Sequence, residues 1–566
     1  MEQWLEIRKS GRFDEIGKKF DVDEVVARVI RNRDVIEEKD IQNYLYGTLD
    51  SMGKPDLLKD AAKAADILQQ KIKEQKKIRI IGDYDIDGIM STYILLSAIQ
   101  HLGGVADIEL PDRIKDGYGV NEQLIEQAIS DGVDTIITCD NGIAAKKELE
   151  SAKEKGLTVI VTDHHEIPFE ETNGNKKYRI PQVDAVVDPK QKDCTYPYKE
   201  ICGAVVAWKV IQLLYRKMNE KTDAVEAFME YAAFATVGDV MDLRDENRIL
   251  VKEGLKRLNQ TTNLGLKALI KENQLEDTTI KAYHIGFILG PCLNASGRLD
   301  TAKKALKLLC ETDELKVTAL AKELTELNTV RKELTRAGVE QAREQIRTSA
   351  WQEQKVYVIY LPDCHESIAG IIAGRIREEY YRPVFVLTKA NEGVKGSGRS
   401  VESYSMYEEL CKCEHLLDKF GGHPMAAGLS MQEKNIEQFR LELNRNTRLR
   451  DCDIQPVIRF DAVLDPKDWN MDRIRQLGRL EPFGKGNEKP IFAARNLRVE
   501  RVRRMGKTNN VQRMMLVDSE GYSCEAVYFG DTDVIEHKNA RILYYPQINT
   551  YQGIDSIQFV ISRIVQ

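Results

Sequence analysis

Three short motifs of acidic and histidine residues follow apolar, strand-like stretches of the chain, and such side chains are typical of divalent-metal sites. The apolar stretches cover residues 78–82, 134–139 and 157–162, and the motifs that follow them are Asp83-Tyr84-Asp85-Ile86-Asp87, Asp140 and Asp163-His164-His165. Ligands of open α/β sheets bind at the carboxyl ends of the strands. Carboxylate oxygens combined with imidazole nitrogens suit Mn²⁺ or Mg²⁺. The three motifs together therefore predict a metal site at the edge of a sheet.

The first motif concentrates three carboxylates in five residues. Asp83, Asp85 and Asp87 alternate by two residues, so an extended backbone would place all three on one side. Such crowding is unfavourable unless a cation compensates for the charge. The alternative is a polar turn that ends at Gly88, although a turn requires one aspartate rather than three. Asp140, which stands alone, would also fit a helix N-cap, and its assignment as a ligand depends on the other motifs.

The two histidines would face opposite ways on an extended backbone, which predicts different roles for them. One could bind a metal ion, and the other could contact a substrate phosphate or protonate a leaving group. Asp163 could orient a histidine by accepting its hydrogen bond. Asp239 closes the apolar segment 236–241 much as the other motifs close theirs, and it is a further candidate ligand.

This number of candidate ligands is large enough for more than one ion. A divalent ion takes about six ligands, and the set could hold two ions that share a carboxylate. Two ions about 3.5–4 Å apart stabilise the attacking and leaving oxygens of a phosphoryl transfer. We therefore expect hydrolysis of a phosphoester or phosphodiester. The chain has no Gly-x4-Gly-Lys-Ser/Thr loop, which argues against ATP-driven chemistry.

Length, charge and cysteine content limit the function further. The 566 residues allow about three or four domains, and the net charge of −7 means that a nucleic acid would need a local basic surface. The ten cysteines form no disulfide or zinc pattern, so we expect free thiols in a reducing cytoplasm. We find no signal peptide and no membrane-length apolar segment, so we expect a cytoplasmic protein without membrane contacts.

The pattern of elements predicts an α/β protein of five segments. Residues 1–50 form a short helical lead-in, and residues 51–300 alternate between strands and helices, which indicates a parallel sheet. Residues 301–346 form a long linker helix, unless this is a solvated helix packed on one domain. Residues 347–450 form a second α/β unit. The short alternating segments of residues 451–566 predict a small β-barrel of the oligonucleotide-binding type, or a barrel without a ligand.

The order of the motifs resembles that of the DHH phosphoesterase superfamily. Further segments are similar to the bacterial RecJ family of single-strand-specific DNA exonucleases, and this similarity runs from about residue 50 to the C-terminus. These segments are residues 110–113, 293–298, 396–400, 421–423 and 480–487. The resemblance implies a DHH catalytic domain at 51–300, a DHH-associated domain at 347–450 and an OB-like barrel at 451–566. It also implies a 5′→3′ exonuclease of recombination and repair that requires Mn²⁺ or Mg²⁺.

The resemblance further implies roles for single residues. His165 would contact the scissile phosphate and Asp83 would support the metal site. The metal ligands would be Asp85, Asp87, Asp140, His164 and Asp239. The residues that hold the terminal phosphate or the DNA backbone would be Arg113, Arg298, Ser397 and Arg399, with His423 in a glycine-rich nucleotide-binding motif. Arginine forks and glycine-rich turns suit phosphate groups chemically.

Single-stranded DNA is therefore the expected substrate, and the resemblance implies a monomer that works with a RecQ-type helicase and a single-strand-binding protein. Two alternatives remain open. The chain could be a DHH phosphodiesterase of short oligonucleotides or cyclic dinucleotides, or a scaffold that binds nucleic acid without cutting it. The C-terminal barrel and the additional arginines favour a polymer, and the complete set of ligands argues against the scaffold.

Overall fold

The computed structural model describes residues 2–111, 119–172, 175–506, 511–530 and 533–566, so Arg113 lies outside the described residues. The chain divides into two compact units. The smaller unit comprises Met1–Gln3, Asn294–Lys304 and Ala319–Ile458, and the larger unit comprises Trp4–Leu293, Ala305–Thr318 and Arg459–Gln566. The described part contains no helix that is long and apolar enough to cross a membrane.

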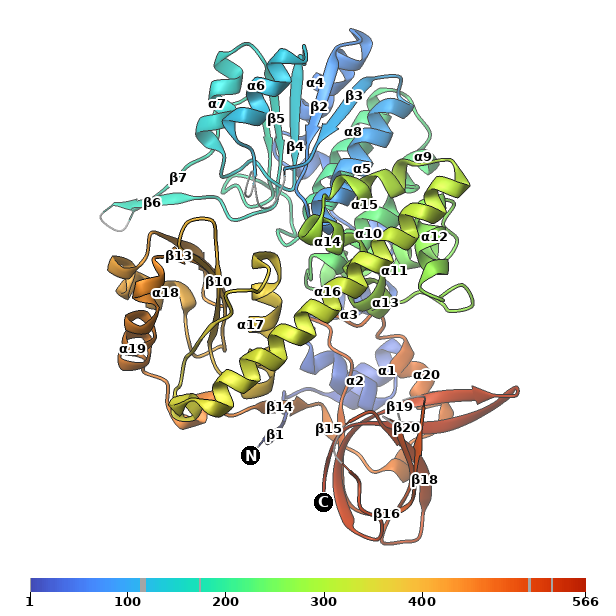
Figure 1. The fold of residues 1–566 in the computed structure, drawn as a ribbon. Coiled ribbons are helices and arrows are strands. Elements are labelled where there is room, and N and C mark those ends of the chain that lie inside the picture. Colours follow the sequence, from blue (N-terminus) through green and yellow to red (C-terminus); the bar gives the residue numbers. More distant parts are fainter. Residues whose placement is uncertain (1, 112–118, 173–174, 507–510, 531–532) are drawn as a thin grey trace. The chain divides into compact units, whose positions relative to one another are not determined.

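A parallel sheet forms the first half of the larger unit, as the alternating pattern predicted (Figure 1). Its order is β3-β2-β4-β5-β8. The bounds are β2 Lys77–Ile81, β3 Val105–Glu109, β4 Thr135–Cys139, β5 Thr158–Thr162 and β8 Ala185–Val187. The central strands β4 and β5 consist of Ile, Val and Thr apart from Cys139, and every residue of β4 is buried. Continuous apolar runs are typical of parallel strands that are covered on both faces.

Helices cover the sheet, and the metal motifs lie where the strands end and the following helices begin. Helices α6 (Glu122–Ser130) and α7 (Lys146–Glu154) contribute Ile125 and Leu149 to a core with strand residues such as Ile136. Helices α5 (Ile86–His101), α8 (Gly203–Lys217) and α10 (Met229–Gly238) pack against one another and are apolar almost all round. A helix with apolar residues on every face must be buried, so these helices form a rigid support for the site.

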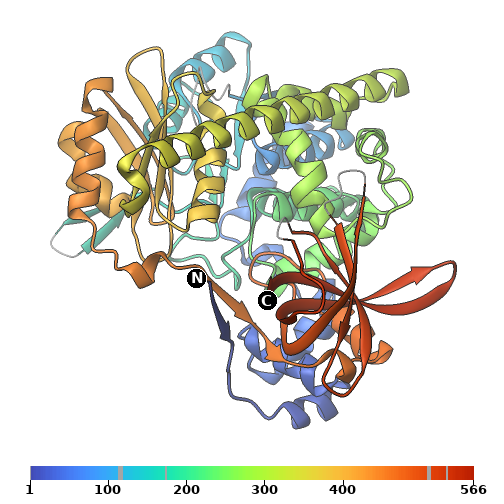
Figure 2. The same ribbon diagram turned by 60° about the horizontal axis from the view of Figure 1, so that its bottom comes forward.

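The C-terminal barrel is closed, which confirms the predicted barrel. Its described strands follow the order β16-β17-β18-β20-β19, and β19 also pairs with β16. The strands are β16 Phe492–Met505, β17 Val511–Val517, β18 Ser523–Tyr528, β19 Asn539–Tyr551 and β20 Ile554–Val565. The β19–β20 hairpin extends beyond the barrel wall (Figure 2). Closure leaves few unpaired strand edges.

The N-terminal helices share one hydrophobic core with the barrel. Helices α1 (Phe13–Phe20), α2 (Glu24–Asn32) and α3 (Glu38–Tyr46) bury residues such as Ile30 against barrel residues such as Phe492. Arg33 and Asp461 add a buried ion pair, with nitrogen–oxygen distances of 2.8 and 3.1 Å. Deletion of the barrel would expose the apolar faces of these helices, so single substitutions are the better test of its role.

The smaller unit contains the second α/β fold. Its sheet has the order β12-β13-β11-β10-β9, with β9 and β10 parallel and the other pairs antiparallel. The bounds are β9 Tyr357–Tyr360, β10 Val384–Lys389, β11 Val394–Arg399, β12 Lys419–His423 and β13 Ala426–Met431. Helix α17 (Glu366–Tyr380) covers one face together with residues of α16 (Glu314–Thr348).

The long helix is confirmed, but its predicted start was wrong. The chain forms α15 (Lys303–Cys310), leaves the helical conformation, and enters α16 at Glu314. Asp313 accepts hydrogen bonds from the backbone N–H groups of Leu315 and Lys316, at 3.0 and 3.1 Å. This aspartate is an N-cap, which starts a new helix inside a segment whose periodicity is uninterrupted.

Arg248 of α11 (Asp245–Leu258) connects the N-terminal helices to the barrel segment. The side chain is 2% exposed. It donates hydrogen bonds to the backbone carbonyls of Tyr44, Leu480 and Arg479, at 3.0, 2.8 and 3.1 Å. The guanidinium also lies 4.0 Å from the centre of the Tyr44 ring. One side chain therefore satisfies carbonyl groups from two distant parts of the chain.

We expect Arg248→Met to lower the free energy of unfolding by about 3 kcal/mol, because several buried carbonyls would lose their donors. Thermal unfolding measures this effect. Arg257→Met is the matched control, since Arg257 lies on the same helix, is partly exposed and pairs with Glu226. Its loss should cost less than about 1 kcal/mol. Equal losses in the two variants would contradict the role assigned to Arg248.

Candidate metal centre

The first motif begins helix α5 and is not extended, so the predicted row of three carboxylates is wrong. The Asp85 carboxylate accepts hydrogen bonds from the N–H groups of Asp87 and Gly88, at 3.0 and 3.1 Å, and so caps α5. A Cβ atom on Gly88 would lie 2.5 Å from the Asp83 carbonyl oxygen, so only glycine fits this turn. The helix starts here because the cap satisfies its free N–H groups.

Asp87 is fixed by the start of a second helix. Its two carboxylate oxygens accept hydrogen bonds from the backbone N–H groups of Gly203 and Ala204, at 2.6 and 2.8 Å. These residues form the first turn of α8, and a helix N-terminus favours a negative charge. The contact joins residues more than a hundred positions apart and sets the direction of the carboxylate.

Asp140 lies in a tight turn after β4. Its φ angle is 59°, a left-handed conformation that Asp and Asn tolerate better than most residues. Gly142 follows with φ 108°, and a Cβ atom there would lie 2.4 Å from Thr138 Oγ1. The Asp140 N–H still bonds to the Thr162 carbonyl at 3.1 Å. The turn therefore carries the Asp140 carboxylate across the end of the sheet.

Asp163 holds the loops after β4 and β5 together. Its Oδ1 atom accepts hydrogen bonds from His164 N–H and from His165 Nδ1, both at 2.7 Å. Its Oδ2 atom accepts from the Ile143 N–H at 2.9 Å. Burial raises the pKa of Asp163, but His165 and the other donors outweigh this and lower it below its usual range. Asp163 therefore stays ionised and orients the His165 ring.

The two histidines lie close together, so the prediction that they face opposite ways is wrong. Their ring centres are 4.5 Å apart, because the backbone leaves the strand conformation after Thr162. Burial lowers the pKa of His165, but the hydrogen bond to Asp163 and the nearby carboxylates overcome this and raise it to about 9. Burial lowers the pKa of His164. The neutral ring is the form that can bind a metal.

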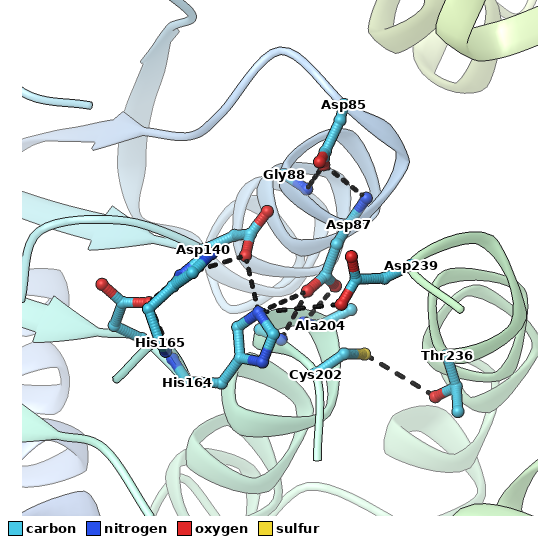
Figure 3. Close-up of polar contacts among 12 residues, drawn as sticks. Asp85, Asp87, Gly88, Asp140, His164, His165, Cys202, Ala204, Thr236 and Asp239 are labelled. Carbon is cyan, nitrogen blue, oxygen red and sulfur yellow. Dashed lines mark hydrogen bonds and ion pairs between the residues drawn. The ribbon is translucent and has the colours of Figure 1, made fainter. Parts of the chain in front are cut away.

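His164 Nε2 lies at the centre of the carboxylate cluster (Figure 3). Its distances to the nearest oxygens of Asp140, Asp87 and Asp239 are 3.2, 3.5 and 3.8 Å. The atom is buried and makes no hydrogen bond of acceptable geometry. A buried polar atom without a hydrogen bond is costly, and the surrounding oxygens are ligands for a hard cation. The cluster therefore fits a divalent ion.

The crowded carboxylates need a positive charge to be stable together. Burial, followed by the charges of Asp87 and Asp85, raises the pKa of Asp239 to about 8. Burial and the same neighbours raise the pKa of Asp140 well above its usual range, and burial with Asp87 raises that of Asp85. Three overlapping groups of side chains could each hold an ion: Asp140 with His164 and His165, Asp87 with His164 and Asp239, and Asp83 with Asp85 and Asp140.

Three of the predicted phosphate-binding residues, Arg298, Ser397 and Arg399, form a second cluster in the smaller unit. Arg298 donates a hydrogen bond to the Ser367 carbonyl at 2.9 Å. Arg399 donates to Ser397 Oγ at 3.2 Å, and a Cβ atom on Gly370 would lie within 2.9 Å of both side chains. All three therefore surround the start of α17. His423 is exposed on β12, and the strand register places it beside β13 in the same row as Arg399.

Sequence reasoning missed Asp188, a fourth acidic residue at a strand end. It follows β8 and is fully buried, and its Oδ2 atom has no hydrogen-bond partner among the described residues. Burial, followed by the charge of Asp163, raises its pKa to about 8. The signal was available, because Val186-Val187-Asp188 repeats the pattern of an apolar strand that ends in aspartate.

Three family models match the chain. The model of the DHH family N-terminal domain matches residues 77–238, that of the DHHA1 domain matches residues 353–448, and that of the RecJ OB domain matches residues 460–563. The first includes every predicted metal ligand apart from Asp239, which follows it directly. The other two cover the second α/β fold and the barrel.

Curated proteins and solved structures agree with these matches. The chain is 36% identical to the single-stranded-DNA-specific exonuclease RecJ of Bacillus subtilis, over 85% of the chain and 59% of that protein. It is 30% identical to RecJ of Haemophilus influenzae, over 97% of both. RecJ of Thermus thermophilus, solved with Mn²⁺, matches with a TM-score of 0.83 and 28% identity, over 100% of the chain and 79% of that structure. The same protein was solved with Mg²⁺, and matches with a TM-score of 0.78 and 26% identity, over 100% of the chain and 78% of that structure. The chain therefore belongs to the RecJ family of DHH proteins.

Proposed function

We propose that this chain is a metal-dependent exonuclease that degrades single-stranded DNA to nucleotides in the 5′→3′ direction, in recombination and repair. The observation that carries the proposal is the buried His164 Nε2 among three carboxylates, in a chain that also has an OB barrel. The barrel supports a polymeric substrate, since such barrels bind single strands. The relatives named above act on single-stranded DNA.

We assign the metal to Asp85, Asp87, Asp140, His164 and Asp239, with Asp83 as support. The groups of candidate ligands overlap at Asp140 and His164, which supports two Mn²⁺ or Mg²⁺ ions. When bound, such ions supply Lewis acidity, which activates water and neutralises charge on the phosphate. Asp87 and Asp85 are held by helix N-termini, so the site needs little rearrangement to bind a cation.

His165 is the residue that moves a proton or donates a hydrogen bond. Its pKa of about 9 keeps the ring protonated at neutral pH, and Asp163 fixes Nδ1 and the orientation of the ring, so that Nε2 is the atom that would contact substrate. Water attacks the scissile phosphorus, the bond to O3′ of the terminal nucleotide breaks, and the leaving oxygen takes up a proton. The imidazolium lies ready to contact a phosphate oxygen and to stabilise the charge that develops.

The smaller unit contributes the phosphate-binding residues in this proposal. Arg298, Ser397 and Arg399 surround the N-terminal turns of α17, where backbone N–H groups favour an anion. With His423 and Arg113 they would hold the terminal phosphate or the DNA backbone. The family-model matches support domains close to 51–300, 347–450 and 451–566, with a lead-in at 1–50 and a linker at 301–346.

The proposal also covers partners and location. A single-strand exonuclease needs an unwound strand, so we expect it to act as a monomer with a RecQ-type helicase and a single-strand-binding protein. Its DNA substrate would place it in the cytoplasm. The competing proposal is a phosphodiesterase of short oligonucleotides or cyclic dinucleotides, which would use the same metal cluster but would have no need of the barrel.

The decisive experiment incubates the protein with Mn²⁺ and a single-stranded oligonucleotide labelled at either end. We expect the 5′ label to appear at once as a mononucleotide, while the 3′ label moves through progressively shorter fragments. A blunt duplex of the same sequence is the control and should persist. Release of the 3′ label first, or cleavage of dinucleotides alone, would contradict the proposal.

A further inference from the structure

A loop at residues 480–488 packs on the segment that follows the metal ligand Asp239. The loop connects α20 (Met471–Gly478) to strand β16 of the barrel, and it lies within the match to the RecJ OB domain. None of its residues belongs to the groups that could hold an ion or to the phosphate-binding cluster of the smaller unit. The function proposed so far therefore gives this loop no role.

Asp239 differs from Asp85 and Asp87 in how its side chain is held. Backbone N–H groups bind the carboxylates of Asp85 and Asp87. Among the residues that the structure describes, no backbone N–H group binds the Asp239 carboxylate. Asp239 is the C-cap of α10, and the chain after it has no regular structure until α11 begins. The direction of this ligand therefore depends on what holds residues 240–244.

The loop fixes the backbone of this segment. Val240, which directly follows Asp239, has a φ of 57°. A β-branched residue in the left-handed region is strained, and such strain persists only where the surrounding structure enforces it. The Leu243 N–H donates a hydrogen bond to the Lys485 carbonyl at 2.7 Å. A Cβ atom on Gly484 would lie 2.7 Å from Leu243 Cδ1, so the two segments approach each other closely.

Both neighbours of Leu243 contact the same loop. Lys485 Nζ lies 3.2 Å from Asp242 Oδ1, and Arg244 Nε donates a hydrogen bond to the Gly486 carbonyl at 3.1 Å. Gly486 has a φ of 72°, and a Cβ atom there would lie 3.0 Å from Asp242 Cβ. Only glycine therefore lets the loop lie this close to the segment.

The loop is itself firmly held. Gly484 and Asn487 exchange two backbone hydrogen bonds, at 3.0 and 3.1 Å. The Asn487 side chain is buried and donates to the carbonyls of Leu480 and Pro482, both at 2.8 Å. It also accepts a hydrogen bond from the Tyr44 hydroxyl at 2.7 Å. A buried polar network whose members are satisfied favours one conformation, so the loop is stiff enough to hold another segment in place.

We propose that the loop at residues 484–487 positions Asp239 for its ion, with Lys485 and Gly486 as positioning residues. Both contact the segment after the ligand rather than the ion. Substitution of groups that orient metal ligands typically weakens metal binding or activity about 10–100-fold. This inference rests on the proposed metal site and deepens it, because the segment that leads into the barrel would then support metal binding as well as DNA binding.

Lys485 allows positioning to be separated from electrostatics. Burial and the charges of Asp87 and Asp85 raise the pKa of Asp239, and the positive charge of Lys485 opposes this rise, so its ammonium acts on the site. A cation beside a metal site repels the ion. Loss of the charge alone would therefore tighten Mn²⁺ binding, whereas loss of the contact with Asp242 would weaken it.

Two variants with matched controls test the loop. Gly486→Ala places a Cβ atom against Asp242, whereas Gly521→Ala alters a barrel glycine of similar φ, 88°, whose Cβ would face open space. Lys485→Met removes the contact with Asp242, and Lys467→Met removes a lysine from another ion pair of the barrel segment. Electron paramagnetic resonance measures the Mn²⁺ dissociation constant without DNA, and circular dichroism melts check that each variant is folded.

We expect Gly486→Ala to bind Mn²⁺ at least about tenfold more weakly, and Lys485→Met to bind it more weakly than the wild type although a repelling charge is lost. Lys485→Arg keeps the charge and can pair with Asp242, so it should match the wild type. Gly521→Ala and Lys467→Met should keep the wild-type dissociation constant. Affinity for a fluorescent 20-nucleotide strand in EDTA should stay unchanged in every variant.

Unchanged or tighter Mn²⁺ binding by folded Lys485→Met would overturn the role of the loop while leaving the metal cluster intact, and this variant decides the question alone if Gly486→Ala does not fold. Weaker strand binding in EDTA with an unchanged Mn²⁺ dissociation constant would also overturn it, because the loop would then contact DNA instead. If the wild type binds no Mn²⁺, the proposed metal site itself fails, and that result precedes any comparison of variants.

Discussion

The substitution His164→Ala is expected to reduce cleavage of single-stranded DNA by about a thousandfold or more, while binding of the strand persists. Among the described residues, His164 Nε2 is the only basic side-chain nitrogen that lies within 4 Å of Asp140, Asp87 and Asp239 together. Its removal would take away a ligand that two of the candidate ion-binding groups share, so metal binding would be weakened. Loss of the Lewis-acid chemistry of the metal costs several kcal/mol of transition-state stabilisation. The barrel, which lies outside this cluster, should still hold DNA.

A second variant separates metal binding from folding. Asp85 both belongs to the cluster and caps α5, so Asp85→Ala would remove a ligand and a helix cap at once. Asp85→Asn keeps an acceptor for the cap and weakens only the metal site. His101→Ala, at the other end of the same helix, is the control. Wild-type activity of both His164→Ala and Asp85→Asn would refute the assignment of the site.

The location of the site could be predicted from the sequence because buried parallel strands have a simple signature. Strands β4 and β5 are continuous runs of Ile, Val and Thr apart from Cys139, and β2 ends in Ile80 and Ile81. Polar residues at the carboxyl ends of such parallel strands must meet at one edge of the sheet. That argument needs only the order of the elements. It would have found Asp188 as well, had β8 been recognised in a run of three apolar residues.

The direction of each side chain could not be predicted, because it depends on contacts between distant residues. Asp87 is aimed by Gly203 and Ala204, and Asp163 by Ile143, which no local pattern reveals. The alternation rule failed at Asp85 since the backbone turns into a helix there. It failed at His164 and His165 because the strand ends one residue before Asp163, so the backbone is no longer extended at the histidines.

The shared core of the N-terminal helices and the barrel could not be predicted from the sequence either. The sequence predicts a helical lead-in at residues 1–50, because the amphipathic pattern of residues 13–46 gives no sign of what covers them. The structure packs them on barrel residues more than 400 positions away, including the buried pair of Arg33 and Asp461. A hydrophobic face shows that a partner is needed, but it does not identify the partner.

The substitution Asp140→Asn is expected to stabilise the protein in EDTA and to destabilise it relative to the wild type in Mn²⁺. Burial and the charges of Asp87, Asp85 and Asp83 raise the pKa of Asp140 well above its usual range. A carboxyl whose pKa is raised by folding destabilises the folded state above its unfolded pKa, and an amide carries no such cost. Asparagine also tolerates the left-handed backbone at this position, where φ is 59°. The metal-free variant should therefore melt at a higher temperature at pH 8.

Mn²⁺ reverses the order of stability of the two proteins, because it binds the folded wild type and stabilises it. An ion at 100 times its dissociation constant stabilises the folded state by about 2.7 kcal/mol, and Asp140→Asn should lose most of that gain because Asp140 belongs to more than one of the groups that could hold an ion. Asp188→Asn is the matched control, since it also removes a buried carboxylate whose pKa is raised to about 8. It should gain stability in EDTA and keep the full response to Mn²⁺. If Mn²⁺ raises the melting temperature of Asp140→Asn as much as that of Asp188→Asn, Asp140 repels its neighbours without binding an ion. The metal site would then be centred on other residues.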